Sequence, residues 1–506
     1  MNNKSLSFRL RRVQISGHAV LREVDITLCG DNDNDNDNDS QDIYTTGIIG
    51  PNGTGKSHLM GAIATIFSDI MHVLNSEKPS RRFSFTVFCD YLGDTYCLSN
   101  IKAERGLMNA NSDPRTEYLS ATMNGKVVSL DDVLLPGRVI ASTMTVTDKF
   151  LAKTDDFYRY KGIRNERSAS TTGTRTIIRK TVDSLMDCMS SKSAFQDELR
   201  ILLSNLGLEE HLHVVYGMRY KDIFLKSDMT AEGLRHIFDN WKDYFHYRDN
   251  PPWGYNNYIM SLRENDEALN AAAVFISTKA QQWEGNSSVA TYDLMQNAWE
   301  FQRDALALRT LTQLDLVTFP SINVVKKGSP FGLENSSSGE THLLCQFIGI
   351  MADIRSGSLV LIDEPENSSH PDWQMNYVGW LKDIFREYRD CHFIIATHSP
   401  LILANMKASE STIVRLVRDN QNRISDEGGM ERGCYSWTID EVLQEVMEMK
   451  SSRTVEYNEA MSEFERALDE DNKVMAKKAY EKLVGLIRPG NELAELLRIQ
   501  MIGLDS

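Results

Sequence analysis

The sequence lacks several features that would place the protein outside a reducing compartment. Its seven cysteines are an odd number and form no C-x-x-C pair. We therefore expect neither a disulfide framework nor a cysteine zinc site. The first twelve residues, MNNKSLSFRLRR, carry charges but no apolar segment of a signal peptide. No apolar run approaches the roughly 20 residues of a membrane helix. These absences predict a cytoplasmic protein with no membrane partner.

An excess of basic charge is also lacking. The chain has 55 Lys and Arg against 71 Asp and Glu, a net charge of −16. This balance argues against a surface coated with phosphate-binding groups, although it leaves room for a local basic patch. Five of the acidic residues lie in an Asp-Asn repeat at 31–39. We interpret the repeat as a solvated loop, because the glycine and terminal glutamate of an EF-hand calcium loop are missing.

The order of apolar patterns predicts an α/β fold in two lobes with a helical segment between them. Strand-like patterns are followed by helical ones at both ends of the chain, whereas 178–313 shows mainly helical stripes. We expect four parts, which are a first ATPase-like lobe at 1–175, a helical insertion at 176–315, a second lobe at 316–425 and a helical C-terminal region at 426–506.

Residues 50–57, GPNGTGKS, match the P-loop pattern G-x-x-x-x-G-K-[ST] in full. A strand pattern at 43–49 precedes the match and a helical pattern follows it, as the motif requires. Glycines let backbone N–H groups curl around phosphate oxygens, the lysine reaches the β- and γ-phosphates, and the serine hydroxyl ligates Mg²⁺. We expect ATP to contact Asn52, Gly53, Thr54, Gly55, Lys56, Ser57 and His58.

A second candidate lies at 358–366, where SLVLIDEPE runs from a β-branched strand into two adjacent carboxylates. Alone, this pattern fits a solvated acidic turn as well as a site. With a P-loop in the chain, Asp363 is expected to join Ser57 as a ligand of Mg²⁺, and Glu364 to polarise the attacking water. The separation of 363 − 57 = 306 residues predicts a nucleotide fold split by the insertion.

Two further motifs stand in a familiar order around this strand. SSSGE at 336–340 precedes Asp363, and ATHSP at 396–400 follows a buried strand. The chain here resembles ABC-type ATPases, most closely the branch containing RecF, the SMC proteins and many prokaryotic defence ATPases. The resemblance assigns Ser337, Ser338, Gly339 and Glu340 to the signature loop and His398 to the catalytic switch position. A histidine at a strand end is otherwise more often structural. Ser336 replaces the usual leading leucine.

The resemblance is incomplete in one place, because the glutamine that usually follows the strands of the first lobe is missing. Ile140–Phe150 occupies a suitable position, with Thr143 or Thr145 as substitutes. Basic residues nearby could contact nucleic acid, or could belong to a solvated segment. They are Arg159, Lys161, Arg164, Arg167, Arg175, Arg179 and Lys180.

The family implies how the site is used. Its signature loop closes over the nucleotide held by another subunit, so one copy of each motif implies a homodimer or higher oligomer driven by ATP. The best match is the ATPase of Septu-type anti-phage systems, PtuA, which implies a partner HNH nuclease (PtuB-like) held in check. In some cases such an ATPase accompanies a retron reverse transcriptase and its DNA product. Two alternatives stay open, which are a RecF/SMC-like repair ATPase that binds DNA directly and an ATP-sensing scaffold with little hydrolysis.

Overall fold

The computed structural model describes most of the 506 residues. The described ranges are 7–29, 43–80, 82–101, 113–164, 173–189, 194–244, 260–282, 288–407, 409–419, 423–426, 434, 437–447, 454–470, 472–488 and 492–503. The Asp-Asn repeat and Arg167 lie outside them. The chain divides into two compact units, Met1–Tyr435 and Ser436–Ser506, and each is described by itself.

The first unit is built on a mixed thirteen-stranded sheet. Six neighbouring strands from β16 to β9 run parallel, whereas the six from β7 to β2 pair antiparallel. In sheet order the strands are β7 (Lys126–Val127), β6 (Ser120–Met123), β5 (Asp94–Ser99), β4 (Ser84–Tyr91), β1 (Arg9–His18), β2 (Arg22–Thr27), β17 (Ile424–Asp426), β16 (Ser411–Arg418), β3 (Tyr44–Ile49), β15 (His392–Ala396), β14 (Leu359–Asp363), β8 (Val139–Thr143) and β9 (Tyr158–Lys161).

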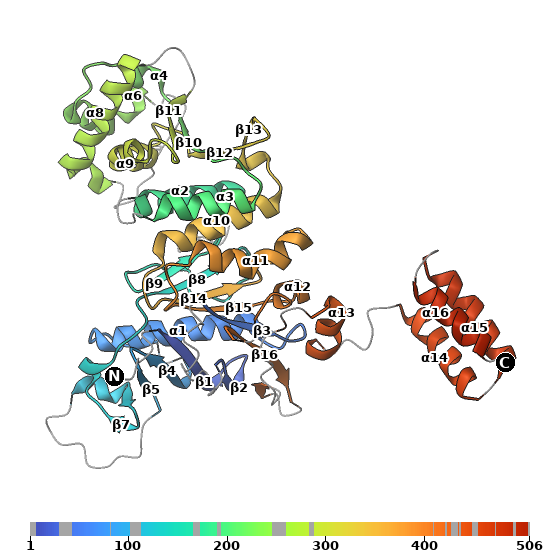
Figure 1. Ribbon diagram of the computed structural model, residues 1–506. Coiled ribbons are helices and arrows are strands. Elements are labelled where there is room, and N and C mark those ends of the chain that lie inside the picture. The colour runs from blue at the N-terminus through green and yellow to red at the C-terminus, as the bar shows by residue number, and fades with distance from the viewer. Residues whose placement is uncertain are drawn as a thin grey trace. The chain divides into compact units, whose positions relative to one another are not determined.

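Helices cover both faces of the parallel part (Figure 1). Helix α1 (Lys56–Leu74) packs on β8, β14 and β15 from one side, and α10 (Ser338–Asp353) packs on β8 and β9. Further along lie α11 (Pro371–Ile384) and the short α12 (Pro400–Leu403). All five residues of β14 are buried, as expected for a strand with helices on both faces. The predicted α/β fold with two nucleotide-fold lobes is therefore confirmed, and its ligand edge is the carboxyl end of β3, β14 and β15.

Helix α1, with 19 residues, has the length and composition of a membrane span, although the sequence was expected to contain no segment of that kind. However, 72% of its most apolar 18-residue segment is buried inside the first unit. For example, the ring of Phe67 in α1 meets that of Phe8, which lies just before β1, edge-on with the centroids 6.0 Å apart. The apolar composition of α1 follows from its place between the parallel and antiparallel parts of the sheet.

The insertion contains strands as well as helices, which differs from the helical domain expected at 176–315. Its helices are α2 (Thr174–Met189), α3 (Phe195–Asn205), α4 (Lys221–Phe224), α5 (Ala231–Asp239), α6 (Trp241–Tyr244), α8 (Asp266–Gln282) and α9 (Ala298–Gln313). Its four-stranded sheet has the order β11 (Ser288–Asp293), β10 (Leu212–Gly217), β12 (Ser321–Lys326) and β13 (Ser329–Gly332). Single 3-10 turns also occur in the first unit. Two of them, Pro114–Glu117 and Leu130–Asp132, precede the insertion, and the others are Leu262–Glu264 and Leu333–Asn335.

The second unit is helical and has its own apolar core. It contains α13 (Ile439–Glu441), a π-helical turn η5 (Val442–Val446), α14 (Val455–Asp469), α15 (Lys473–Leu486) and α16 (Glu492–Gly503). Phe464, Leu483 and Leu497 lie at the centre of this core. The unit spans Ser436–Ser506 and lies within the helical region expected at 426–506, whereas Asp426 itself belongs to β17 of the large sheet.

Candidate functional site

The P-loop connects β3 to α1 at the carboxyl end of the sheet. Gly53 and Gly55 have φ angles of 84° and 101°, in the left-handed region that favours glycine. Gly55 is also the N-cap of α1, and no side chain caps the helix there. The first backbone N–H groups of α1 are therefore left available, together with the positive end of the helix dipole. This loop is a fitting cradle for a phosphate group.

Lys56 is the first residue of α1 and is only 5% exposed. Its Nζ donates to the carbonyl oxygens of Gly50 at 2.7 Å and Pro51 at 3.4 Å. Within the described part of the chain, Lys56 has no carboxylate partner at ion-pair distance. Burial lowers the pKa of Lys56 to about 8, although nearby carboxylates, including Glu364, oppose the shift. A buried cation that contacts only neutral carbonyls fits an incoming anion.

Ser57 and Asp363 meet although 306 residues separate them in the chain. Ser57 Oγ donates to Asp363 Oδ1 at 3.2 Å. Asp363 ends β14 and is 1% exposed. Burial raises the pKa of Asp363 to about 7, the Ser57 hydrogen bond acts against this rise, and the Glu364 charge adds to it. A hydroxyl beside a buried carboxylate is a donor set that suits Mg²⁺, whose charge would offset the burial of the carboxylate.

Glu364 leaves the strand in a left-handed conformation, with φ of 51°. Its N–H donates to the carbonyl of Ala396 at 2.8 Å, which fixes the turn against β15. Asn367 Nδ2 donates to Glu364 Oε2 at 3.0 Å, and His398 Nε2 lies 4.0 Å from Oε1. The Glu364 side chain is 30% exposed, so its carboxylate can reach water. The geometry thus brings Glu364 and His398 together, as expected from their order in the sequence.

His398 lies near two charged groups of the site, Lys56 and Glu364. Burial and the positive charge of Lys56 lower the pKa of His398, and only the Glu364 carboxylate acts against this shift. The imidazole is therefore held towards its neutral form, which can accept or donate a hydrogen bond at neutral pH.

Glu366 is a site residue that the sequence reading did not identify. Its carboxylate accepts hydrogen bonds from Thr397 Oγ1 at 2.9 Å and from the His398 N–H. Desolvation raises the pKa of Glu366, and these bonds oppose the rise. Glu366 therefore holds the backbone that presents His398. The available signal was a third carboxylate in the run Asp-Glu-Pro-Glu, two residues after Glu364.

The signature loop at 336–340 forms the start of α10. Ser337 caps the helix, and Glu340 returns the contact to the Ser337 N–H, which makes a capping box. Glu340 also pairs with Lys326 at 2.7 Å. Ser337 and Ser338 are exposed. A Cβ at Gly339 would lie 2.3 Å from the carbonyl oxygen of Ser368, so only glycine allows the helix to meet the turn after Glu364.

The structure joins most of the expected site residues but not all of them. Among the described residues, no hydrogen bond or ion pair links the signature loop to the P-loop. His58 flanks the P-loop in α1, where burial lowers its pKa. Thr143 ends β8 directly beside Asp363, and its hydroxyl bonds that of Thr145 at 3.0 Å. Thr143 and Thr145 therefore lie in the segment where ABC-type ATPases usually have the glutamine.

Several of the basic residues after β8 have partners inside the fold. Arg164 binds Asp148 at 2.6 Å, and Lys161 binds Asp353 at 2.6 Å. Asp353 also accepts from the buried Arg138 at 2.7 Å. These contacts fasten β9 and the end of α10, and they account for two of the cations that were candidates for nucleic-acid contact.

A P-loop after one parallel strand, a carboxylate pair at the end of the next strand but one, and a signature loop that opens a helix form the arrangement typical of ABC-type P-loop ATPases. Comparison with protein families gives a match at residues 298–404 to "AAA domain, putative AbiEii toxin, Type IV TA system". The Septu protein PtuA of Bacillus thuringiensis is 32% identical over 143 residues, 28% of this chain and 35% of PtuA. The resemblance to the Septu and retron-associated ATPases is therefore confirmed.

A second curated relative is the Retron Vc95 probable ATPase of Vibrio cholerae serotype O1 biovar El Tor. It is 24% identical over 225 residues, 37% of this chain and 42% of the relative. The matches thus span well under half the length of either relative. Among solved structures, the Smc head domain of Pyrococcus furiosus gives 12% identity over 83% of this chain and 95% of that chain, with a TM-score of 0.31. The SMC head domain from Thermotoga maritima is 13% identical, and the match covers 83% of this chain and 100% of that chain with a TM-score of 0.33.

Proposed function

We propose that the chain binds ATP with Mg²⁺ at the carboxyl end of β3 and β14 and hydrolyses it slowly. The observation that carries this proposal is the contact between Ser57 and Asp363, with Glu364 and His398 at the same edge. Lys56 and Asp363 are buried there with no ion-pair partner among the residues that the structure describes, which fits a site for an anion and a cation together.

The side chains divide the work of hydrolysis. Lys56 and the N–H groups of the P-loop hold the phosphates, while Ser57 and Asp363 hold Mg²⁺. The bound metal supplies charge neutralisation at the phosphate oxygens. Glu364 accepts a hydrogen bond from the attacking water and orients it. Asn367 fixes one Glu364 oxygen, and His398 lies near the other. Glu366 keeps His398 in place through the backbone.

We infer that the active form is a homodimer. The exposed Ser337 and Ser338 lie at the N-terminus of α10 and do not contact their own P-loop in the described chain. The positive end of a long helix with hydroxyl groups fits the phosphates bound by a second copy. ATP then joins two chains, and hydrolysis releases them, which makes the nucleotide a two-state switch.

The dimer is tested by measuring mass with light scattering at saturating Mg·ATP. The Glu364→Gln chain, in which ATP should persist, is expected to double its mass. Adding Ser337→Arg should keep the mass that of a monomer, because the bulky cation blocks the interface. Ser227→Arg, at an exposed position in the insertion, is the matched control and should leave the dimer intact. A dimer that persists with Ser337→Arg would refute the composite site.

We propose a role in anti-phage defence, in the cytoplasm, where free cysteines such as the seven here persist. The support is similarity to the Septu protein PtuA and to a retron ATPase. In this role the ATPase restrains a partner HNH nuclease of the PtuB-like kind, with or without a retron reverse transcriptase and its DNA product. Purification of the tagged chain from its native operon should recover a nuclease. Recovery of DNA without a nuclease would instead favour a RecF/SMC-like repair ATPase.

A further inference from the structure

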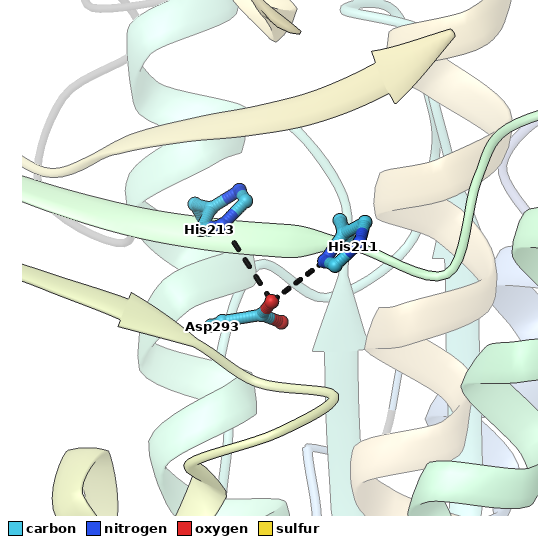
Figure 2. A group of neighbouring side chains, drawn as sticks. All are labelled: His211, His213 and Asp293. Atoms are coloured by element: carbon cyan, nitrogen blue, oxygen red, sulfur yellow. Dashed lines mark hydrogen bonds and ion pairs between the residues drawn. The ribbon is translucent and has the colours of Figure 1, made fainter. Parts of the chain in front are cut away.

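Three side chains of metal-ligand type meet on the polar face of the four-stranded sheet in the insertion (Figure 2). They are His211, just before β10, His213 on β10 and Asp293 at the end of β11. Asp293 Oδ2 lies 2.7 Å from His211 Nδ1 and 3.6 Å from His213 Nε2. The three ligand atoms all lie within 4.8 Å of one another. The proposed ATPase mechanism uses none of these residues.

The sheet fixes this convergence. His213 and Asp293 are direct partners across β10 and β11, and His211 shares their face because it lies two residues before His213. On the opposite face, Leu212, Val214 and Tyr216 are buried. A slip of one residue would turn both histidines into the core, so the apolar face fixes the register that gathers them.

Asp293 is also oriented by the backbone. Its Oδ1 accepts the Met295 N–H at 3.0 Å, which leaves Oδ2 towards the two imidazoles. The two rings are stacked, with centroids 5.8 Å apart and planes 7° from parallel. A carboxylate held by a backbone donor is the kind of support that metal ligands commonly have.

A simple ion pair explains only part of this geometry. The contact of 2.7 Å pairs His211 with Asp293, but 3.6 Å is too long for a hydrogen bond from His213. In a tetrahedral zinc site with bonds of about 2.0–2.1 Å, ligand atoms lie about 3.3 Å apart. The observed spacings bracket this value, so small side-chain rotations would bring all three atoms to one ion. Imidazole nitrogens with a carboxylate oxygen are a ligand set that zinc accepts.

We propose that His211 Nδ1, His213 Nε2 and Asp293 Oδ2 bind one Zn²⁺ ion. The side chains of His211 and His213 are 38% and 29% exposed, so water can reach the remaining coordination position. The ion joins β10 to β11 and fixes the end of β11 that leads into α9. The insertion thereby carries a metal site that is separate from the Mg²⁺ ligands Ser57 and Asp363.

The test uses the full-length chain, stripped of metal with a chelator and titrated with Zn²⁺ against a chromogenic chelator. Excess Mg²⁺ occupies oxygen-rich sites but does not compete for imidazole. One Zn²⁺ per chain is expected. His211→Gln, His213→Gln and Asp293→Asn should each weaken binding at least about tenfold. His236→Gln, an exposed histidine elsewhere in the insertion, should bind Zn²⁺ as the wild type does.

Co²⁺ substitution identifies the ligands. The wild type should show a visible ligand-field band without the near-ultraviolet charge-transfer band of thiolate ligands, which excludes the cysteines as the site. The band should disappear in the double variant His211→Gln/His213→Gln, with an unchanged circular dichroism spectrum to show that the variant is folded. The proposal is overturned if the wild type binds no Zn²⁺, if the double variant binds it equally tightly, or if the spectrum shows thiolate ligation.

Discussion

Two buried groups of opposite charge, Lys56 and Asp363, lie at the same edge of the sheet. Burial lowers the pKa of Lys56 to about 8 and raises the pKa of Asp363 to about 7. Each group is therefore only weakly held in its charged form before ligands arrive. In the proposed complex the phosphates and the metal ion would supply the missing opposite charges, so binding and ionisation would be coupled.

This coupling predicts a narrow pH window for binding. Below about pH 7 Asp363 takes up a proton and loses its ability to ligate Mg²⁺, and above about pH 8 Lys56 loses its charge. Affinity for Mg·ATP, measured by calorimetry from pH 6 to 9, should peak between these values. Lys56→Arg keeps its charge and should remove the fall on the alkaline side. Equal affinity across the whole range would contradict the two displaced pKa values.

The raised pKa of Asp363 also predicts an effect on stability. Because the folded pKa lies above the unfolded one, this group makes the protein less stable as pH rises, and the full cost is present above about pH 7. Asp363→Asn should therefore raise the melting temperature of the ligand-free chain at pH 8 by about 2–4 °C. At pH 4 the gain should vanish. The same variant should lose the stabilisation that Mg·ATP gives to the wild type, and a lower melting temperature at pH 8 would count against the burial argument.

At the scale of elements, the strands that carry the site could be predicted from local pattern. Every residue of β3, β14 and β15 is buried, β14 and β15 contain continuous apolar runs, and each of the three strands is followed by polar residues of the site. Strands β10 and β11 could not be recognised as a pair, because 70 residues of mainly helical pattern lie between them. The alternation of Leu212, Val214 and Tyr216 was present in the sequence, but its partner strand was not evident.

The contact between α10 and the turn after Glu364 gives a prediction at this scale. Gly339→Ala would place a methyl group against the Ser368 carbonyl and push away the turn that holds Asn367. We expect a loss of stability of about 1–3 kcal/mol, together with slower ATP turnover. Gly379→Ala is the matched control, because its Cβ meets no atom within 4 Å, and it should be neutral or stabilising by up to about 1 kcal/mol. Denaturant unfolding distinguishes the two, and equal effects would exclude a specific contact at Gly339.

At the scale of the whole molecule, the site depends on residues that are far apart in the sequence. Ser57 and Asp363 meet only because the chain returns to the same sheet after the insertion. The order of motifs made this return predictable, whereas the strand pattern alone could not distinguish a solvated acidic turn at Asp363 and Glu364 from a site. The run Asp-Glu-Pro-Glu shows Glu366 as a third carboxylate, but its role depends on contacts with Thr397 and the His398 backbone that only the folded chain provides.

The central claim is that Glu364 orients water for ATP hydrolysis, and steady-state phosphate release by the full-length chain tests it most directly. Glu364→Gln should lower turnover about 10²–10⁴-fold while Mg·ATP affinity, measured separately by calorimetry, stays within a few-fold of the wild type. Glu334→Gln, an exposed glutamate just before the signature loop, should turn over as the wild type does. Wild-type turnover no faster than that of Glu364→Gln would contradict the account and leave an ATP-binding scaffold.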